Sequence, residues 1–300
     1  MTRPSTTDRT EHHVGTELQP VESVSVLTVC DNTIDIFLID EEPAHRILGR
    51  GDAPPMVDAR TMRGRQLIDA PDAQHGFSAL VTVSYGGERR SVLFDFGISP
   101  DGCAQNLSRL GHRTSEIDAV ACSHGHFDHT AGLATLADEL GARHVPFVVH
   151  PDFWQERRLV IGDTVIDLPA VDRAAIESAG FDLVENTGPT LLADDHVLLT
   201  GQIERQTEFE QGFAFQQARH GGEWEPDPDT LDDQALVVDV ADHGLVVLTG
   251  CGHAAGLLDD IEASQQPDLD QTAIDELDSR ILDAMTTLGV SDTCVGGVPG

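Results

Sequence analysis

Short apolar runs, many of them alternating with polar residues, recur along most of the chain between turn-forming residues. Apolar runs of about four to eight residues indicate β-strands, whereas apolar residues spaced three and four apart indicate helices. Gly86 and Gly87 fall between two such runs and indicate a hairpin turn. The pattern predicts strands at residues 21–29, 34–39, 77–85, 91–96, 117–122, 145–149, 197–200, 235–240 and 245–249. It predicts helices at residues 102–110, 130–140, 173–179 and 256–288.

Two segments interrupt the alternation of predicted strands and helices. Residues 41–75 are rich in proline, glycine, aspartate and arginine and form a long excursion, and residues 219–233 form a charged loop that contains prolines. The chain shows no internal repeat and no clear linker. We therefore predict a single α/β domain with a mixed sheet over residues 21–300, preceded by a polar, disordered leader at residues 1–20.

Acidic residues dominate the charge of the chain. Its 300 residues include 52 acidic and 18 basic ones, and all the basic residues are arginine, which gives a net charge of −34. So few basic residues leave no basic face for DNA, RNA or an anionic bilayer, so we predict neither a nucleic-acid nor a membrane partner. The absence of lysine favours a halophilic source, in which concentrated salt screens the carboxylates. The alternative is an ordinary acidic cytosolic protein.

The five cysteines are odd in number, widely spaced and without a Cys-x-x-Cys pair: Cys30, Cys103, Cys122, Cys251 and Cys294. This spacing does not indicate a disulfide framework, so it favours a reducing cytoplasm. The first 20 residues also lack the hydrophobic core of a signal peptide. We therefore predict a cytoplasmic protein.

The segment His124-Gly125-His126-Phe127-Asp128-His129 places four side chains that can bind metal within six residues, between a predicted strand and a predicted helix. Residues two apart on extended backbone project to the same side, so His124 and His126 can hold one ion. Asp128 and His129 follow as the chain turns and can face a second ion. Imidazoles with one carboxylate suit Zn²⁺, and also Fe²⁺ or Mn²⁺.

This motif resembles the hallmark of the metallo-β-lactamase fold hydrolases. Residues 31–32, 74–78, 123–133, 200–205 and 248–254 together resemble one subgroup, which includes the archaeal dihydropterin-methyl ribofuranosylaminobenzene phosphate synthase. The resemblance covers roughly residues 21–296. It implies an αββα sandwich, in which two mixed sheets carry helices on their outer faces and two divalent ions lie at one sheet edge.

The resemblance also implies roles for residues outside the motif. His253 is the expected further metal ligand, and Asp95 is expected to orient a histidine rather than bind metal itself. Cys251 occupies the place where many members have a bridging aspartate, which leaves a thiolate ligand and a buried structural cysteine as alternatives. His150 and His75 are each either a site residue or part of a surface turn.

The sequence departs from the subgroup at its end. Members usually continue after a Gly-Gly-x-His-Leu segment to a later His-Cys-Thr-Gly, whereas this sequence ends with residues 295–300, Val-Gly-Gly-Val-Pro-Gly. We expect either that the last strand and its histidine are missing or that another residue completes the second ion's ligands.

Three functions follow from the site. The first is a hydrolase that uses a metal-activated water on a small-molecule ester, amide or phosphoester, with Asp128 orienting the water and accepting its proton. The second is a pterin-type transferase of cofactor biosynthesis. The third is a degenerate metal-binding sensor without catalysis. The sequence does not predict the oligomeric state.

Five of the 18 arginines cluster in the excursion: Arg46, Arg50, Arg60, Arg63 and Arg65. One interpretation is a lid whose guanidinium groups bind an anionic substrate. The other is a solvated loop that pairs with the acidic body of the protein.

Overall fold

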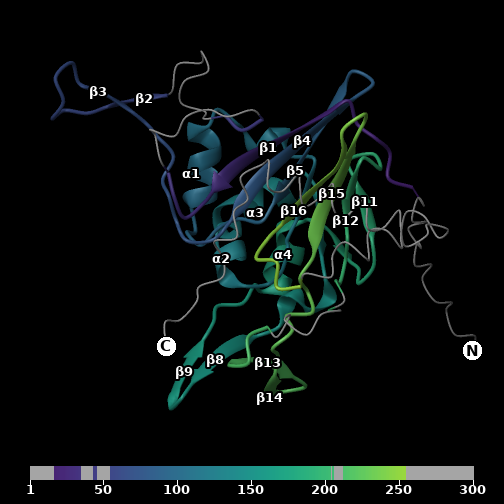
Figure 1. The fold of residues 1–300 in the computed structure, drawn as a ribbon. Helices are drawn as coiled ribbons and strands as arrows, with labels where there is room; N and C mark the ends of the chain where they lie inside the picture. Colours follow the sequence, from purple (N-terminus) through teal and green to yellow (C-terminus); the bar gives the residue numbers. More distant parts are fainter. Residues whose placement is uncertain (1–16, 35–42, 46–54, 204, 206–211, 255–300) are drawn as a thin grey trace, which may run out of the picture.

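The computed structural model describes residues 17–34, 43–45, 55–203, 205 and 212–254 (Figure 1). The strand predicted at 34–39 and the helix predicted at 256–288 lie almost wholly or wholly outside these residues. The leader and the last segment, 295–300, do so as well, apart from residues 17–20. Among the described residues, no helix is long and apolar enough to cross a membrane.

The first sheet has six strands in the order β1-β4-β5-β6-β7-β10. β1, β4 and β5 are antiparallel neighbours, while β5, β6, β7 and β10 run parallel. The hairpin predicted around Gly86 and Gly87 is confirmed as the β4–β5 connection. The strands are β1 (Ser23–Cys30), β4 (Ser78–Tyr85), β5 (Glu88–Phe94), β6 (Ala119–Ala121), β7 (Pro146–Val149) and β10 (Asp182–Glu185).

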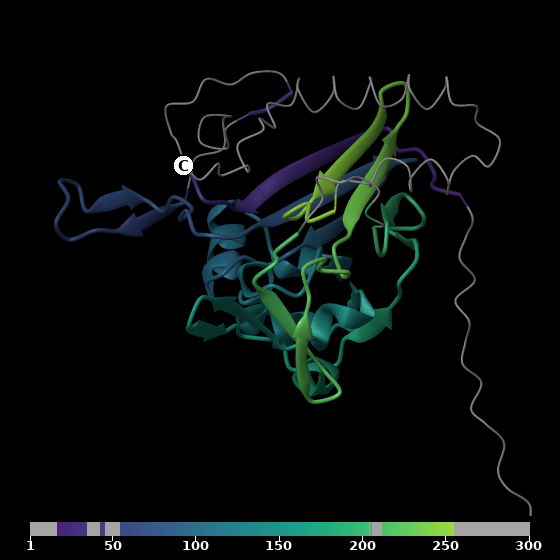
Figure 2. The same ribbon diagram turned by 60° about the horizontal axis from the view of Figure 1, so that its bottom comes forward.

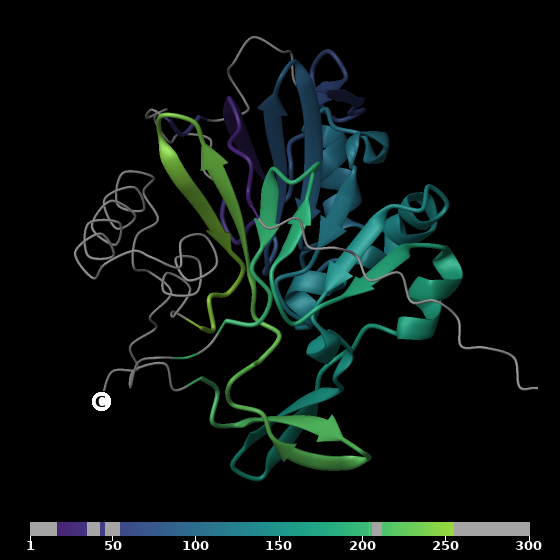
Figure 3. The same cartoon turned by 90° about the vertical axis from the view of Figure 1, so that its right-hand side faces the viewer.

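The second sheet is antiparallel and packs face to face against the first (Figure 3). Its strands are β11 (Thr190–Leu192), β12 (Val197–Leu199), β15 (Ala235–Val240) and β16 (Gly244–Thr249). Val81 and Phe94 of the first sheet belong to the same buried cluster as Leu199, Leu236 and Val238 of the second. Their alternating apolar residues therefore form the interior of a two-sheet sandwich.

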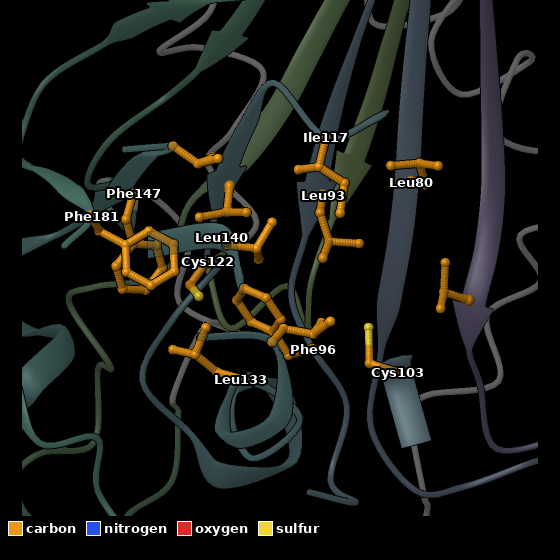
Figure 4. Packing of buried hydrophobic residues seen from close by; sticks show 14 of the residues in the cluster. Leu80, Leu93, Phe96, Cys103, Ile117, Cys122, Leu133, Leu140, Phe147 and Phe181 are labelled. Carbon is orange, nitrogen blue, oxygen red and sulfur yellow. The ribbon is translucent and has the colours of Figure 1, made fainter. Parts of the chain in front are cut away.

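Helices cover the other face of the first sheet (Figure 1). They are α1 (Gly102–Arg109), α2 (Phe127–Thr130), α3 (Leu133–Gly141) and α4 (Arg173–Ala179), with short 3₁₀ turns at Thr114–Glu116 and Pro151–Trp154. Phe147 on the sheet packs with Phe96 and Phe181, and Leu133 and Leu140 of α3 complete this core (Figure 4). The predicted α/β sandwich is confirmed, but among the described residues its second sheet is antiparallel rather than mixed. The helix predicted at 130–140 begins earlier and is divided into α2 and α3.

A third, four-stranded sheet extends beyond one end of the sandwich (Figures 1 and 3). Its order is β14-β13-β8-β9, from β8 (Arg157–Ile161), β9 (Thr164–Asp167), β13 (Gln216–His220) and β14 (Glu223–Pro226). The prediction of a loop at 219–233 is therefore wrong at its start. β14 has little apolar pattern because it lies at the sheet edge, where backbone pairing with β13 holds it.

The excursion at 41–75 contains a further hairpin, β2 (Met56–Asp58) and β3 (Gln66–Ile68), which projects from the sandwich (Figures 1 and 2). Arg65 forms an exposed ion pair with Asp58 of the same hairpin, with 3.0 Å between Nη2 and Oδ2. This pair favours a solvated loop over the lid, although Arg65 pairs within the hairpin and not with the acidic body as predicted. Residues 46–54, with two of the five arginines, lie outside the described residues.

Candidate metal centre

The histidine motif follows β6 and enters α2, at an end of the first sheet. His124, His126 and His129 are buried, with relative exposures of 0%, 9% and 2%. Gly125 allows close packing in this turn, because a Cβ there would lie 2.2 Å from the Phe153 carbonyl oxygen. The turn therefore fixes three imidazoles in the protein interior.

Three ring nitrogens converge in a first group. His124 Nε2 lies 2.9 Å from His126 Nδ1 and 3.2 Å from His253 Nε2, so the segment after β16 meets the motif after β6. Nitrogens bound tetrahedrally to one Zn²⁺ at ~2.05 Å would lie about 3.3 Å apart. The spacing and chemistry of these donors therefore fit a divalent ion.

A second group lies beside the first and shares His124 with it. His129 Nε2 is 3.0 Å from Cys251 Sγ, and the ligand atoms of His124, His129 and Cys251 lie within 4.8 Å of one another. Asp128 Oδ2 is 3.7 Å from His129 Nε2. Cys251 is exposed, so the structure contradicts the alternative of a buried structural cysteine.

Asp95 is hydrogen-bonded to residues of both groups, either directly or through Ser123. Its Oδ2 lies 2.7 Å from His129 Nδ1, its Oδ1 accepts from the Ser123 backbone N–H, and its Oδ2 also accepts from the Ser123 hydroxyl. The Ser123 hydroxyl oxygen, whose own proton is donated to Asp95, lies 2.8 Å from His124 Nδ1. Asp95 therefore orients His129 directly and His124 through Ser123, which agrees with the role expected for it. Sequence reasoning missed Ser123, although it directly precedes the motif.

Burial sets the protonation of the first group. It lowers the pKa of His124 well below its ordinary value, lowers that of His126, and lowers that of His253 to about 3. Burial alone would also lower the pKa of His129, but the Asp95 carboxylate raises it well above its ordinary value. The three rings of the first group are therefore neutral and offer lone pairs, as metal ligands must.

The two remaining candidates lie differently. His75 is exposed and stands at the rim of the second group, with its Nε2 3.5 Å from Asp128 Oδ2 and its Nδ1 3.1 Å from Asn32 Oδ1. His150 is buried and lies in neither group, so the surface-turn alternative is wrong for it. Its Nδ1 accepts from the Asp152 backbone N–H and thereby caps the 3₁₀ turn that follows β7.

Sequence reasoning also missed Gln216 and Arg157 of the third sheet and Asp232 of the loop between β14 and β15. Gln216 Oε1 lies 2.8 Å from His126 Nε2, and Asp232 accepts the Gly125 backbone N–H. Arg157 pairs with the same Asp232. No sequence pattern predicts that these residues lie at the centre, because they are isolated polar residues far from the motif in sequence.

Known proteins resemble this chain in sequence and in structure. The family model described as Metallo-beta-lactamase superfamily matches residues 72–258. The chain is 26% identical over 191 residues to the 7,8-dihydropterin-6-methyl-4-(β-D-ribofuranosyl)-aminobenzene-5'-phosphate synthase of Methanocaldococcus jannaschii, covering 60% of this chain and 62% of that one. It is 28% identical over 158 residues to Metallo-beta-lactamase domain-containing protein 1 of Xenopus laevis, covering 51% and 62%.

The chain thus spans about three fifths of the length of these two relatives. Among solved structures, an N-acyl homoserine lactone hydrolase aligns with a TM-score of 0.37 at 12% identity, covering 77% of this chain and 76% of that one.

Proposed function

The chain belongs to the metallo-beta-lactamase superfamily, and from this premise we propose that it is a hydrolase of a small molecule that holds two divalent ions. The observation that carries the proposal is the convergence of three neutral imidazole nitrogens, His124 Nε2, His126 Nδ1 and His253 Nε2. Nitrogen lone pairs that meet with neither a proton nor a cation between them repel one another, so a bound cation would stabilise this arrangement of buried rings. Zinc suits this set best, with iron or manganese as alternatives.

We assign the ligands from the two groups and add Asp128, because its Oδ2 lies 3.7 Å from His129 Nε2. His124, His126 and His253 would hold the first ion, while Asp128, His129 and Cys251 would hold the second. Bound divalent ions supply a water that ionises near neutral pH and a Lewis acid for a carbonyl or phosphoryl oxygen. The Cys251 thiolate would favour a soft ion such as Zn²⁺ in the second group.

Asp128 and His75 would position the reacting water and accept its proton. The Asp128 carboxylate is 16% exposed and faces both His129 and His75, so it can orient a water at the mouth of the site and accept its proton. His75 is exposed beside Asp128 and can pass that proton to solvent. A small ester, amide or phosphoester, including an anionic one, is the substrate class that this chemistry serves.

A transferase is the second candidate, and the likeness to the archaeal synthase favours it. Incubating the protein with a dihydropterin diphosphate and a ribofuranosylaminobenzene phosphate distinguishes the two: a transferase joins them and releases diphosphate, whereas a hydrolase forms no joined product. A degenerate sensor would bind metal and turn over neither those compounds nor a panel of esters and phosphoesters.

Metal analysis of the full chain, purified in molar KCl, tests the metal centre. We expect about two equivalents of zinc in the wild type and a loss of at least one in His126→Ala and His253→Ala. His243→Ala is the matched control, because His243 is exposed on the β15–β16 turn and should leave the metal content unchanged. A wild type without bound metal would reject the proposal.

A further inference from the structure

The third sheet contacts the metal centre through one buried glutamine. We infer that Gln216 is a positioning residue that keeps the proton of His126 on Nε2, so that the Nδ1 lone pair faces the first ion. The inference rests on the proposed metal centre and adds a residue outside the ligand set. Gln216 begins β13, is 1% exposed, and places Oε1 2.8 Å from His126 Nε2.

The orientation of the Gln216 amide follows from its other contacts. Its Nε2 lies 3.0 Å from the Asp227 carbonyl oxygen, 3.2 Å from Asp227 Oδ2 and 3.2 Å from Thr230 Oγ1. A carbonyl and a carboxylate only accept hydrogen bonds, so the NH₂ group must face them. The amide oxygen then faces His126 and requires a donor there.

A single proton on the ring completes the assignment. An imidazole that binds a metal ion is neutral, because its ligating nitrogen must carry a free lone pair. A neutral imidazole carries its proton on one nitrogen only, and Gln216 needs that proton on Nε2. Nδ1 is therefore unprotonated, and it is this atom that lies 2.9 Å from His124 Nε2.

Buried ion pairs hold Gln216 and the histidine turn together. Arg157 of β8, the neighbour of β13, is 3% exposed and pairs with Asp227 at 2.9 Å and with Asp232 at 2.6 Å. Asp232 also accepts the Gly125 backbone N–H at 2.7 Å, and Asp227 faces the Gln216 amide. One guanidinium thus fixes both the backbone before His126 and the residue that faces its ring.

The burial of the Arg157 ion pairs indicates that they position neighbouring groups rather than stabilise the fold. A buried ion pair loses most of its Coulomb gain to desolvation, so it adds little net stability. It does hold groups in one arrangement. Partners of the non-ligating nitrogen typically change metal affinity about 10- to 100-fold when they are removed.

The test reads the ring directly in zinc-free protein. Long-range ¹H–¹⁵N NMR of the histidine rings, with His126 assigned from its loss in His126→Ala, should show the Nε2–H form in the wild type. Gln216→Met keeps the side-chain length but removes the acceptor, and should shift His126 toward the Nδ1–H form. Zinc affinity of the same variant, measured by chelator competition, should fall about 10- to 100-fold.

Gln217→Met is the matched control. Gln217 is the next residue on β13 and accepts from Arg158 Nε at 2.9 Å, on the opposite face of the strand. It should leave the tautomer and the zinc affinity unchanged. An Nδ1–H ring in the wild type would overturn the inference even if Gln216→Met fails to fold. A folded Gln216→Met with wild-type tautomer and affinity would do so too. Absent zinc binding in the wild type would instead reject the proposed function, while the zinc-free tautomer still decides the role of Gln216.

Discussion

Each histidine of the motif has one ring nitrogen engaged by a protein group, and its other nitrogen faces the centre. Asp95 takes Nδ1 of His129, Ser123 takes Nδ1 of His124, and Gln216 takes Nε2 of His126. His124 therefore presents Nε2 to the first group, and His126 presents Nδ1. Partners of this kind fix both ring orientation and tautomer.

Asp233 is a third buried carboxylate near the centre, after Asp95 and Asp232. Its Oδ2 accepts the backbone N–H of Ala254, the residue after His253, at 2.9 Å, while its Oδ1 is buried without a hydrogen-bond partner among the described residues. Burial raises the pKa of Asp233 to about 7. The buried position of the Asp233 carboxyl group therefore disfavours its ionised form.

This pKa predicts a pH dependence of stability. Between pH ~4 and ~7 the folded chain binds a proton at Asp233 that the unfolded chain does not, so the free energy of unfolding falls as the pH rises through this window. Asp233→Asn removes that fall. Urea denaturation of metal-free protein should show the variant gaining on the wild type between pH 5 and pH 8, by at most about 3 kcal/mol.

Asp167→Asn, at an exposed end of β9, serves as the control and should differ from the wild type equally at both pH values. Parallel pH slopes for the wild type and Asp233→Asn would contradict the prediction.

At the scale of elements, the strands rich in apolar residues were predicted from the sequence, and the polar or exposed strands were not. β4, β15 and β16 were predicted within a residue or two, because their alternating or continuous apolar runs line the sandwich. β8, β9, β13 and β14 were missed. They are short, largely polar or exposed, and held by pairing with one another, which a local pattern does not reveal.

The turn between β6 and α2 gives a prediction for Gly125. A Cβ there would lie 2.2 Å from the Phe153 carbonyl oxygen and 3.0 Å from Arg157 Nη1, so Gly125→Ala must displace backbone. We expect the free energy of unfolding to fall by about 1–3 kcal/mol, as for other overpacked sites, and the zinc content to fall with it. Chemical denaturation and metal analysis measure the two effects.

Gly188→Ala is the comparison variant, because the nearest atom to a Cβ at Gly188 is 3.9 Å away. It should change neither stability nor zinc content by a comparable amount. Equal effects of the two substitutions would contradict the steric argument.

For the whole molecule, the net charge of −34 is the dominant property. Mutual repulsion among carboxylates destabilises a compact state, and salt shortens the Debye length from about 10 Å at 0.1 M to about 3 Å at 1 M. If the acidic composition is an adaptation to salt, the melting temperature should rise steeply between 0.1 and 2 M KCl. Circular dichroism melts measure this, with sucrose as an uncharged control; a flat salt profile would exclude the adaptation.

The sequence by itself determined the main strands and the local motif from which a metal site is predicted. The motif at 124–129 is local, so its spacing alone indicates a metal site, and the sandwich strands carry their burial in their own pattern. It also gave the expected role of Asp95, through the resemblance. The assignment of the ligands to ions stays a prediction until metal is measured.

The resemblance named His253 and Cys251 as candidates, but only the tertiary structure brought them to the motif and added Gln216. His253 and Cys251 meet the motif across 129 and 122 residues of sequence, and Gln216 meets it across 90. The structure also showed that buried His150 caps a 3₁₀ turn and that part of residues 219–233 forms a strand. Such contacts depend on strand order and on packing between sheets, and no local spacing of residues encodes them.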